Sequence, residues 1–323
     1  MRAIVNTAPG RLEWLEVPCP EPGPGQVRVR TAACGICATD LVMIDGWERT
    51  GFPSIPGHEW AGWVDAVGPG VQSALVGQRC VADNVWTDGG EVGFEYPGGY
   101  GEYLVTEARN LYALPASLPL AQASLLEPLA VCLRGLHRWQ TGDARAALVL
   151  GDGPIGLLLT VLLRRQGVEG VVLVGGRPAR LALARELGAT QTADYHQAGT
   201  ALAEMLMSLP GAPFPCVAEA SGAAAAAAAA VLVAARGGRV LIAGDYGRAT
   251  AGWPWNHLLH RELTLVGTNT GAGAWAEAVQ LAVSGAVPLG RLVSATYPAT
   301  AFAEAMAAVR ERRDLVKVVL TWE

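Results

Sequence analysis

The strongest constraint on the fold is an alternation of short apolar runs and helix-like segments that begins near residue 141. The runs are apolar almost throughout, which is typical of parallel strands that helices cover on both faces. The predicted strands are 147–150, 171–175, 216–220, 239–244 and 263–267, and the predicted helices are 157–167, 179–188, 223–235 and 273–284. This part of the chain is therefore predicted to be an α/β, doubly wound parallel sheet.

A glycine-rich loop joins the first predicted strand to the first predicted helix. Its sequence, Gly151-Asp152-Gly153-Pro154-Ile155-Gly156, fits G-x-G-x-x-G in the strand–turn–helix context that gives this pattern meaning. The first glycine permits a tight turn, the second lets the backbone approach a pyrophosphate, and the third lets helix and strand pack closely. The loop therefore predicts a dinucleotide site contacted by Gly151, Gly153, Pro154, Ile155 and Gly156, the alternative being a glycine turn without a ligand.

The choice of dinucleotide depends on the end of the next strand. Loops of this kind are normally followed about 20 residues later by an acid that binds the ribose 2′-hydroxyl. Residues 170–185 contain no acid; Gly175, Gly176, Arg177 and Arg180 stand there instead. An arginine suits a 2′-phosphate. We therefore expect NADP to be favoured over NAD, with Gly175, Arg177 and Arg180 in the site; the alternative for Arg180 is an ordinary exposed helix position.

The N-terminal part of the chain is rich in glycine and proline and has short alternating apolar runs. Residues 1–17 fit two strands around a turn at Pro9-Gly10, Val27 to Arg30 alternate with period two, and 57–70 and 77–82 fit further strands. Residues 294–320 fit strand, helix and strand. This part is predicted to be a β-rich domain.

Composition excludes several classes of function. The 323 residues carry a net charge of −5, so nucleic acid is not an expected partner. Lys317 is the one lysine of the sequence, so the chain has no lysine for a Walker A loop or for a Tyr-x-x-x-Lys pair. Lys317 is also the one residue that could form a lysine Schiff base. The uncharged, alanine-rich stretch 221–235 is too short to cross a bilayer, and residues 1–17 lack a signal-peptide core. Six sparse cysteines favour a reducing compartment, so we expect a cytoplasmic protein without a membrane partner.

Candidate metal ligands are concentrated in the β-rich part. Cys34 and Cys37 form one C-x-x-C, His58 and Glu59 follow about twenty residues later, and Glu127 comes further on. A lone C-x-x-C is also compatible with a redox pair. One thiolate, one imidazole and one or two carboxylates suit Zn²⁺ and leave a position open, which a catalytic site needs.

Taken together, these motifs resemble the zinc-dependent medium-chain dehydrogenase/reductase family, the alcohol dehydrogenase superfamily, and in particular its polyol, threonine and glucose dehydrogenase branch. The resemblance covers nearly the whole chain and rests on GICATD (35–40), GHEWAGWVDAVGPGV (57–71), GGYGEYLV (98–105), LLEPLAV (125–131), the glycine loop and VKVVL (316–320). It implies a GroES-like catalytic domain formed by 1–142 and 286–323, and a Rossmann domain formed by 143–285.

The resemblance also implies a role for each metal-site residue. Cys37 is the zinc thiolate and His58 the imidazole ligand. Glu59 is a direct ligand in the polyol branch and lies behind the ligands in others. Glu127 is a ligand or holds the water on the zinc.

Catalytic roles follow from the same resemblance. Thr39 takes the proton of the alcohol, Asp40 orients His58, and Cys34 is a neighbour of the site. The implied activity is hydride transfer between an alcohol, such as a polyol, sugar or secondary alcohol, and NAD(P). Assembly as a homodimer or homotetramer through edge strands of the nucleotide domains is also implied.

Three departures from the family pattern qualify these expectations. Residues 83–97, where many relatives carry four zinc-binding cysteines, contain none, so we expect one catalytic zinc and no structural zinc. Val42 stands where many relatives have a relay histidine, and Ala38 where some have a pyrophosphate-binding arginine. Two alternatives remain: a zinc-free quinone or enoyl reductase of the same fold, and a non-catalytic NADP-binding protein.

Overall fold

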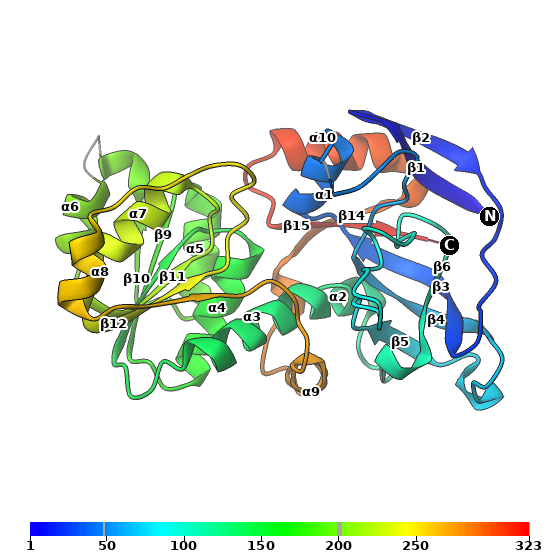
Figure 1. Ribbon diagram of the computed structural model, residues 1–323, viewed down its shortest axis with the longest axis horizontal. Coiled ribbons are helices and arrows are strands. Elements are labelled where there is room, and N and C mark those ends of the chain that lie inside the picture. Colours follow the sequence, from blue (N-terminus) through cyan, green and yellow to red (C-terminus); the bar gives the residue numbers. More distant parts are fainter. Residues whose placement is uncertain (48, 199–201, 323) are drawn as a thin grey trace. The chain divides into compact units, whose positions relative to one another are not determined.

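The computed structural model describes residues 1–47, 49–198 and 202–322 (Figure 1). The chain forms two compact units, Met1–Ala130 with Gly271–Glu323, and Val131–Thr270, which we call units 1 and 2. The units divide after residues 130 and 270, earlier than the expected domain boundaries after 142 and 285. Those boundaries stay predictions.

Unit 2 is built on a six-stranded, wholly parallel sheet. Its strand order is β10-β9-β8-β11-β12-β13, so the two halves of the sheet run outward from β8 and β11. This is the Rossmann order 3-2-1-4-5-6, and the predicted doubly wound sheet is confirmed. The strands are β8 (Ala146–Leu150), β9 (Gly170–Gly175), β10 (Gln191–Asp194), β11 (Phe214–Glu219), β12 (Ala234–Ile242) and β13 (Thr264–Gly267).

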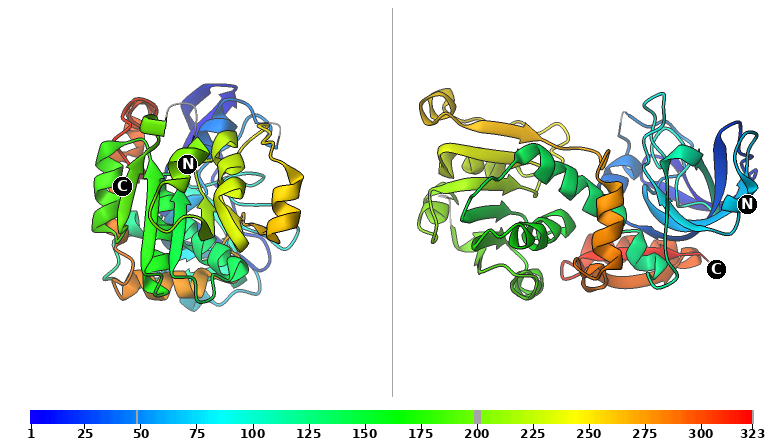
Figure 2. Two further views of the ribbon diagram at one scale, coloured as in Figure 1. Left: turned by 90° about the vertical axis from the view of Figure 1, so that its left-hand side faces the viewer. Right: turned by 90° about the horizontal axis from the view of Figure 1, so that it is seen from below.

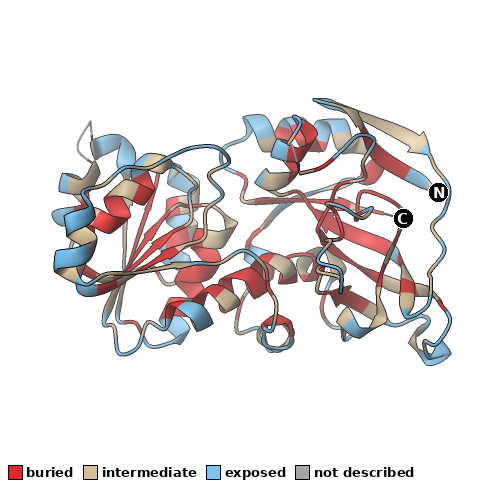
Figure 3. Ribbon diagram, viewed as in Figure 1, coloured by how far each residue is buried: buried red, intermediate tan, exposed pale blue. Residues whose placement is uncertain are grey.

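Helices cover both faces of this sheet (Figure 2). They are α4 (Pro154–Arg165), α5 (Pro178–Glu186), α6 (Leu202–Met207), α7 (Ala224–Val233) and α8 (Trp255–Arg261). Because β–α–β crossovers are right-handed, α4 and α5 lie on one face, and α7 and α8 on the other. The central strands and the sheet-facing sides of the helices are buried (Figure 3). The alanine run forms α7, as the high helix propensity of alanine predicts.

Unit 1 is β-rich. It contains a hairpin, β1 (Arg2–Ala8) with β2 (Arg11–Glu16), and a sheet in the order β14-β15-β3-β4-β5-β7, with β6 also paired to β3. The sheet strands are β3 (Gln26–Gly35), β4 (Glu59–Val67), β5 (Arg79–Ala82), β6 (Tyr103–Glu107), β7 (Leu111–Ala113), β14 (Val293–Pro298) and β15 (Lys317–Thr321). Val27 and Val29 are buried on one face, as their alternation predicted.

Its helices are α1 (Ala38–Ile44), α2 (Leu120–Ala123), α9 (Trp275–Val283) and α10 (Phe302–Glu311), while α3 (Leu126–Trp139) contains residues of both units. The helix predicted at 273–284 and the closing strand–helix–strand are present. The elements that were not predicted are helices α1, α2, α3, α6 and α8 and strands β6, β7 and β10. Helix α1 is short and contains β-branched residues, so its sequence carries little helical signal. No helix in the described part of the chain has the length and apolar character to cross a membrane.

Candidate active site

Three predicted metal ligands meet in unit 1. Cys37 is the N-cap residue of α1, His58 precedes β4, and Glu59 is the first residue of β4. A ligand atom from each lies within 4.8 Å of the others. His58 and Glu59 are buried and Cys37 is half-buried, so the three ligand atoms are close together and largely screened from water.

Asp40 links two of these residues. Its Oδ2 accepts hydrogen bonds from the Cys37 backbone N–H at 2.8 Å and from the Tyr100 hydroxyl at 3.1 Å. Its Oδ1 lies 3.2 Å from His58 Nδ1. Asp40 thus fixes the start of α1 as part of a capping box, and its other carboxylate oxygen faces His58 Nδ1. Tyr100 was not predicted from the sequence, because it lies in a glycine-rich segment before β6 and is not part of a metal-binding pattern.

The electrostatics of His58 follow from these neighbours. Burial lowers the pKa of His58, but the Asp40 carboxylate and then Cys37 raise it more, so that the pKa lies well above its usual value. A carboxylate beside the ring makes an imidazole a stronger metal ligand.

Glu59 forms a buried ion pair with the one lysine of the chain. Lys317 Nζ lies 2.6 Å from Glu59 Oε1 and 3.3 Å from the Ile36 carbonyl oxygen. Burial lowers the pKa of Lys317, but the Glu59 carboxylate raises it more, so the ammonium keeps its charge. Glu59 Oε2 has no hydrogen-bond partner within the described residues. It lies against Gly35, where any side chain would occupy its place.

Glu127 lies in the first turn of α3 and is half-buried. Its carboxylate is outside the group of three ligand atoms. Burial raises the pKa of Glu127 to about 7, with opposing smaller effects from His58 and Glu59. Because the charges of His58 and Glu59 affect its pKa, the Glu127 carboxylate lies near the cluster of three ligand atoms.

The remaining catalytic candidate, Thr39, lies beside the cluster. Its Oγ1 is 3.7 Å from Cys37 Sγ. Cys34 is buried, donates to the Gly35 carbonyl and is not part of the metal-ligand group. The residues present fit a zinc ion: thiolate, imidazole and carboxylate are its usual donors, and the buried Glu59 Oε2 lacks a partner that a cation would supply.

The cysteine-free segment 83–97 packs against the same unit through other contacts. Trp86 stacks on Tyr96 with ring centroids 3.8 Å apart, and Arg49 pairs with Glu91 and Glu95, each at 2.7 Å. Aromatic stacking and ion pairs therefore hold this segment.

The glycine loop of unit 2 has the geometry expected of a nucleotide cradle. Gly151 has a φ of +119°, which only glycine adopts readily. A Cβ at Gly156 would lie 1.9 Å from the Gly151 carbonyl oxygen, whereas a Cβ at Gly153 would meet nothing within 4 Å. The absence of a side chain at 156 is thus needed for packing, and at 153 it leaves open space at the start of α4. Pro154 is the first residue of α4, followed by Ile155.

The second half of the predicted nucleotide site lies where β9 ends. Gly175 is the last residue of β9, and Arg177 is the N-cap residue of α5. Arg177 Nη1 lies 2.7 Å from Asp152 Oδ1, and Arg180 Nη1 lies 3.9 Å from the same oxygen. The structure thus brings both predicted arginines to Asp152. Sequence reasoning treated this acid only as the variable position of the loop.

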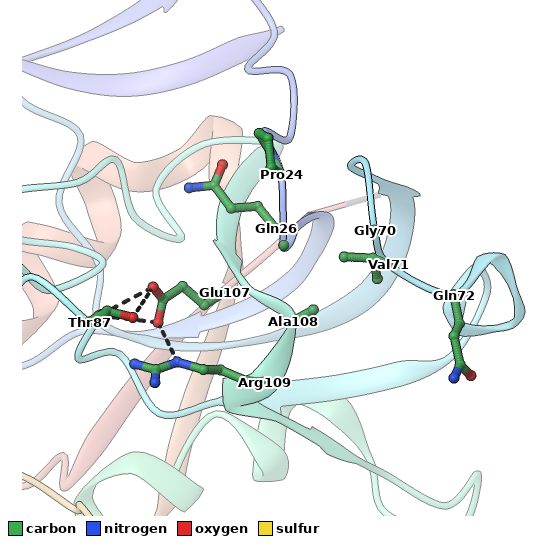
Figure 4. A pocket seen from close by; sticks show the side chains of 10 residues that line it. Pro24, Gln26, Gly70, Val71, Gln72, Thr87, Glu107, Ala108 and Arg109 are labelled. Atoms are coloured by element: carbon green, nitrogen blue, oxygen red, sulfur yellow. Dashed lines mark hydrogen bonds and ion pairs between the residues drawn. The ribbon is translucent and has the colours of Figure 1, made fainter.

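Figure 4 shows an open pocket in unit 1 that contains none of the predicted site residues. It is lined by loops around Pro24, Gly70 and Thr87. Its carboxylate, Glu107, already accepts hydrogen bonds from Thr87 and Arg109, so we assign it no role.

Comparisons with known proteins agree with this arrangement. Residues 23–116 match the alcohol dehydrogenase GroES-like domain, and residues 154–284 match the zinc-binding dehydrogenase family. A D-altritol 5-dehydrogenase of Agrobacterium fabrum is 31% identical, over 92% of this chain and 93% of that protein.

Solved structures give the same result. An alcohol dehydrogenase from Escherichia coli CFT073, complexed with NADH, has a TM-score of 0.92 at 26% identity, covering 99% of both chains. A Sinorhizobium meliloti 1021 protein described as a zinc-binding dehydrogenase, bound to NADP, has a TM-score of 0.90 at 27% identity, covering 99% of this chain and 98% of that one. With a GroES-like domain, a Rossmann sheet and these relatives, the chain belongs to the zinc-dependent medium-chain dehydrogenase/reductase family.

Proposed function

We propose that this protein is an alcohol dehydrogenase that uses one zinc ion and NAD(P) to interconvert an alcohol and a ketone. One observation carries the proposal: Cys37, at the start of α1, and the consecutive residues His58 and Glu59, at the start of β4, present three ligand atoms within 4.8 Å of one another in a member of this dehydrogenase family. Zinc-free relatives on this fold have no need of such a buried donor set.

Polyols, sugars and secondary alcohols are the proposed substrate class. The similarity to a D-altritol 5-dehydrogenase over almost the full length of both chains supports a polyol.

The proposed metal ligands are Cys37, His58 and Glu59 through Oε2, with Glu127 as a ligand or as the group that holds water on the zinc. A zinc ion held there would act as a Lewis acid that makes the alcohol oxygen more acidic. Asp40 orients His58 through Nδ1 and, through the Cys37 N–H, fixes the start of the helix that carries the thiolate. Lys317 balances the charge of Glu59, so that the carboxylate is held at one oxygen and available at the other.

Thr39 is the proposed first acceptor of the alcohol proton. Its hydroxyl lies beside Cys37 Sγ and can both accept and donate a hydrogen bond. With Val42 in the place of the family histidine, the path of the proton beyond Thr39 must use other groups.

For the cofactor, we propose that Gly151, Gly153 and Gly156 form the pyrophosphate cradle and that NADP is favoured over NAD. The open space at Gly153 supports the cradle, and Arg177, with Arg180 nearby, supports the 2′-phosphate. The solved relatives include both an NADH complex and an NADP complex.

Assembly as a homodimer or homotetramer through the edge strands of the Rossmann sheets, in the cytoplasm, completes the proposal. Within the described residues, β13 pairs with β12 on one side only. The adjacent α8 exposes Trp255 and Leu259. Equilibrium sedimentation of the purified chain would give the number of subunits.

The proposal is tested by following absorbance at 340 nm with NAD⁺ and NADP⁺ in parallel, against polyols, sugars, threonine and simple secondary alcohols. We expect one class to be oxidised, faster with NADP⁺, and about one zinc per chain by elemental analysis. Faster reduction of NAD⁺ would keep the enzyme and remove the cofactor preference. No turnover together with no bound zinc would favour the zinc-free or non-catalytic alternative.

A further inference from the structure

Asp152, at the second position of the glycine loop, is a buried acid that the proposed function does not use. Its side chain is only 3% exposed. A Cβ at Gly175 would lie 2.5 Å from Asp152 Oδ2, so the carboxylate fills the space where the side chain of residue 175 would start. That position, at the end of the second strand, is where an acid for the ribose is expected. The chain therefore places a carboxylate there from a different segment.

The contacts of this carboxylate are those of a bound anion. Asp152 Oδ2 accepts hydrogen bonds from the backbone N–H groups of Gly176 and Arg177, both at 2.9 Å. Oδ1 accepts one from Arg177 Nη1 at 2.7 Å. Consecutive backbone N–H groups with an arginine are a usual anion-binding arrangement. Asp152 thus occupies an anion site that the turn after β9 creates.

The pairing with Asp152 leaves part of the Arg177 guanidinium exposed. Its side chain is 35% exposed, although its Nε is buried. A second anion can therefore reach the guanidinium. It would meet two arginine charges, Arg177 and Arg180, and one opposing carboxylate charge. A phosphate monoester carries between about one and a half and two negative charges near neutral pH, so the carboxylate repels it.

We propose that Asp152 determines how strongly this protein prefers NADP over NAD. The carboxylate holds the two N–H groups and part of the Arg177 guanidinium, and it adds a like charge beside the 2′-phosphate of NADP. It does not serve as the ribose acceptor, because its side chain is only 3% exposed and its oxygens face Gly176 and Arg177. Removing its charge strengthens 2′-phosphate binding and leaves the rest of the nucleotide site unchanged. This inference rests on the proposed nucleotide site of unit 2.

The test measures binding of two nucleotide fragments to the full chain by calorimetry, with no turnover required. Adenosine 2′,5′-bisphosphate carries the 2′-phosphate, and 5′-AMP lacks it. In Asp152→Asn we expect the bisphosphate to bind about tenfold more tightly than in the wild type, because a repulsive charge at a recognition site is removed. Binding of 5′-AMP should change by less than about twofold, since the amide oxygen can still accept from the backbone N–H groups.

A double-mutant cycle shows whether Asp152 acts through Arg177. Arg177→Gln alone should weaken binding of the bisphosphate and leave binding of 5′-AMP unchanged. Adding Asp152→Asn to Arg177→Gln should recover much less than the gain seen with Arg177 present. Glu169→Gln is the matched control, because it removes the same charge from an exposed position in the same unit and should change neither affinity.

If Asp152→Asn weakened binding of both fragments equally, the inference would be overturned. Asp152 would then serve only to maintain the conformation of the glycine loop. No change in either ligand would also overturn it. If circular dichroism shows that Asp152→Asn is unfolded, Asp152→Ser, which keeps one acceptor without charge, takes its place with the same expected result. Failure of both fragments to bind the wild type would reject the proposed nucleotide site as well, whereas binding without an effect of residue 152 would reject this inference alone.

Discussion

The two units hold buried carboxylates in opposite ways. In unit 1, Glu59 is neutralised by one side chain, Lys317, which is 258 residues away in sequence, and its other oxygen has no partner in the described part of the chain. In unit 2, both oxygens of Asp152 are satisfied, two of the three hydrogen bonds coming from backbone N–H groups 24 and 25 residues away. The first carboxylate is ready to receive a cation, and the second completes a turn that would otherwise bind an anion.

In the proposed function, this difference separates the chemistry from the binding of the nucleotide. The metal cluster depends on side chains from β4, β15 and the start of α1, so that each is held by the packing of unit 1. The nucleotide loop depends mainly on missing side chains and on backbone geometry. Changes in one unit should therefore leave the function of the other intact, which the following variants test.

The largest effect is expected from Cys37→Ser. Loss of the thiolate removes a zinc ligand, and Lewis-acid stabilisation worth several kcal/mol corresponds to a fall in kcat of roughly 10³-fold. NADPH binding, followed by its fluorescence, should be nearly unchanged. The exposed Cys19→Ser is the control for loss of a thiol. Full activity of Cys37→Ser with wild-type zinc content would remove Cys37 from the ligand set.

Lys317→Met should give the next largest effect. In zinc-free protein it leaves Glu59 buried without its counter-charge, which costs about 3–5 kcal/mol of the free energy of unfolding. Urea denaturation followed by tryptophan fluorescence measures the loss. The double variant Glu59→Gln/Lys317→Met removes both charges and should recover most of the stability. If Lys317→Met were as stable as the wild type, other charges would compensate the Glu59 carboxylate in the absence of Lys317.

A smaller effect is expected in unit 2 from Gly156→Ala. The new Cβ meets the Gly151 carbonyl, and overpacking of this kind costs about 1–3 kcal/mol. Nucleotide binding should weaken while zinc content stays the same. Gly153→Ala is the matched comparison, because its Cβ meets no protein atom: it should weaken nucleotide binding without lowering the melting temperature. Equal loss of stability in both variants would contradict the packing role of Gly156.

The last effect concerns pH and Glu127 in zinc-free protein. Burial raises the pKa of Glu127 from 4.5 to about 7, so the folded state binds a proton more tightly than the unfolded state does. The stability from this group is fully present below pH 4.5 and is lost as the pH rises to about 7. Chemical denaturation of chelator-treated protein across this window should show a decrease that Glu127→Gln lacks. An equal slope in both proteins would place the titrating group elsewhere.

Much of unit 2 could be predicted from the sequence, because its signals are local. Continuous apolar runs, the glycine loop and the arginines after β9 each lie within a few residues of one another. Strand β10 was missed because it is polar and lies at the sheet edge, where burial places little demand on composition. Asp152 was missed because its partners lie in the turn after the next strand, and only the parallel pairing of β8 with β9 brings them together.

For unit 1, the sequence predicted the types of ligand, and family resemblance supplied their roles. The sequence by itself determined which residues can form the metal site: a thiol, an imidazole and carboxylates in a chain with a single lysine. Only the tertiary structure decided that Lys317 meets Glu59, that Tyr100 and His58 share Asp40, and that Glu127 lies outside the trio. The physical reason is that a local sequence pattern indicates secondary-structure propensity and which residues are buried. The pairing of charged side chains depends instead on the distances between segments, which the order of the strands in the sheet determines.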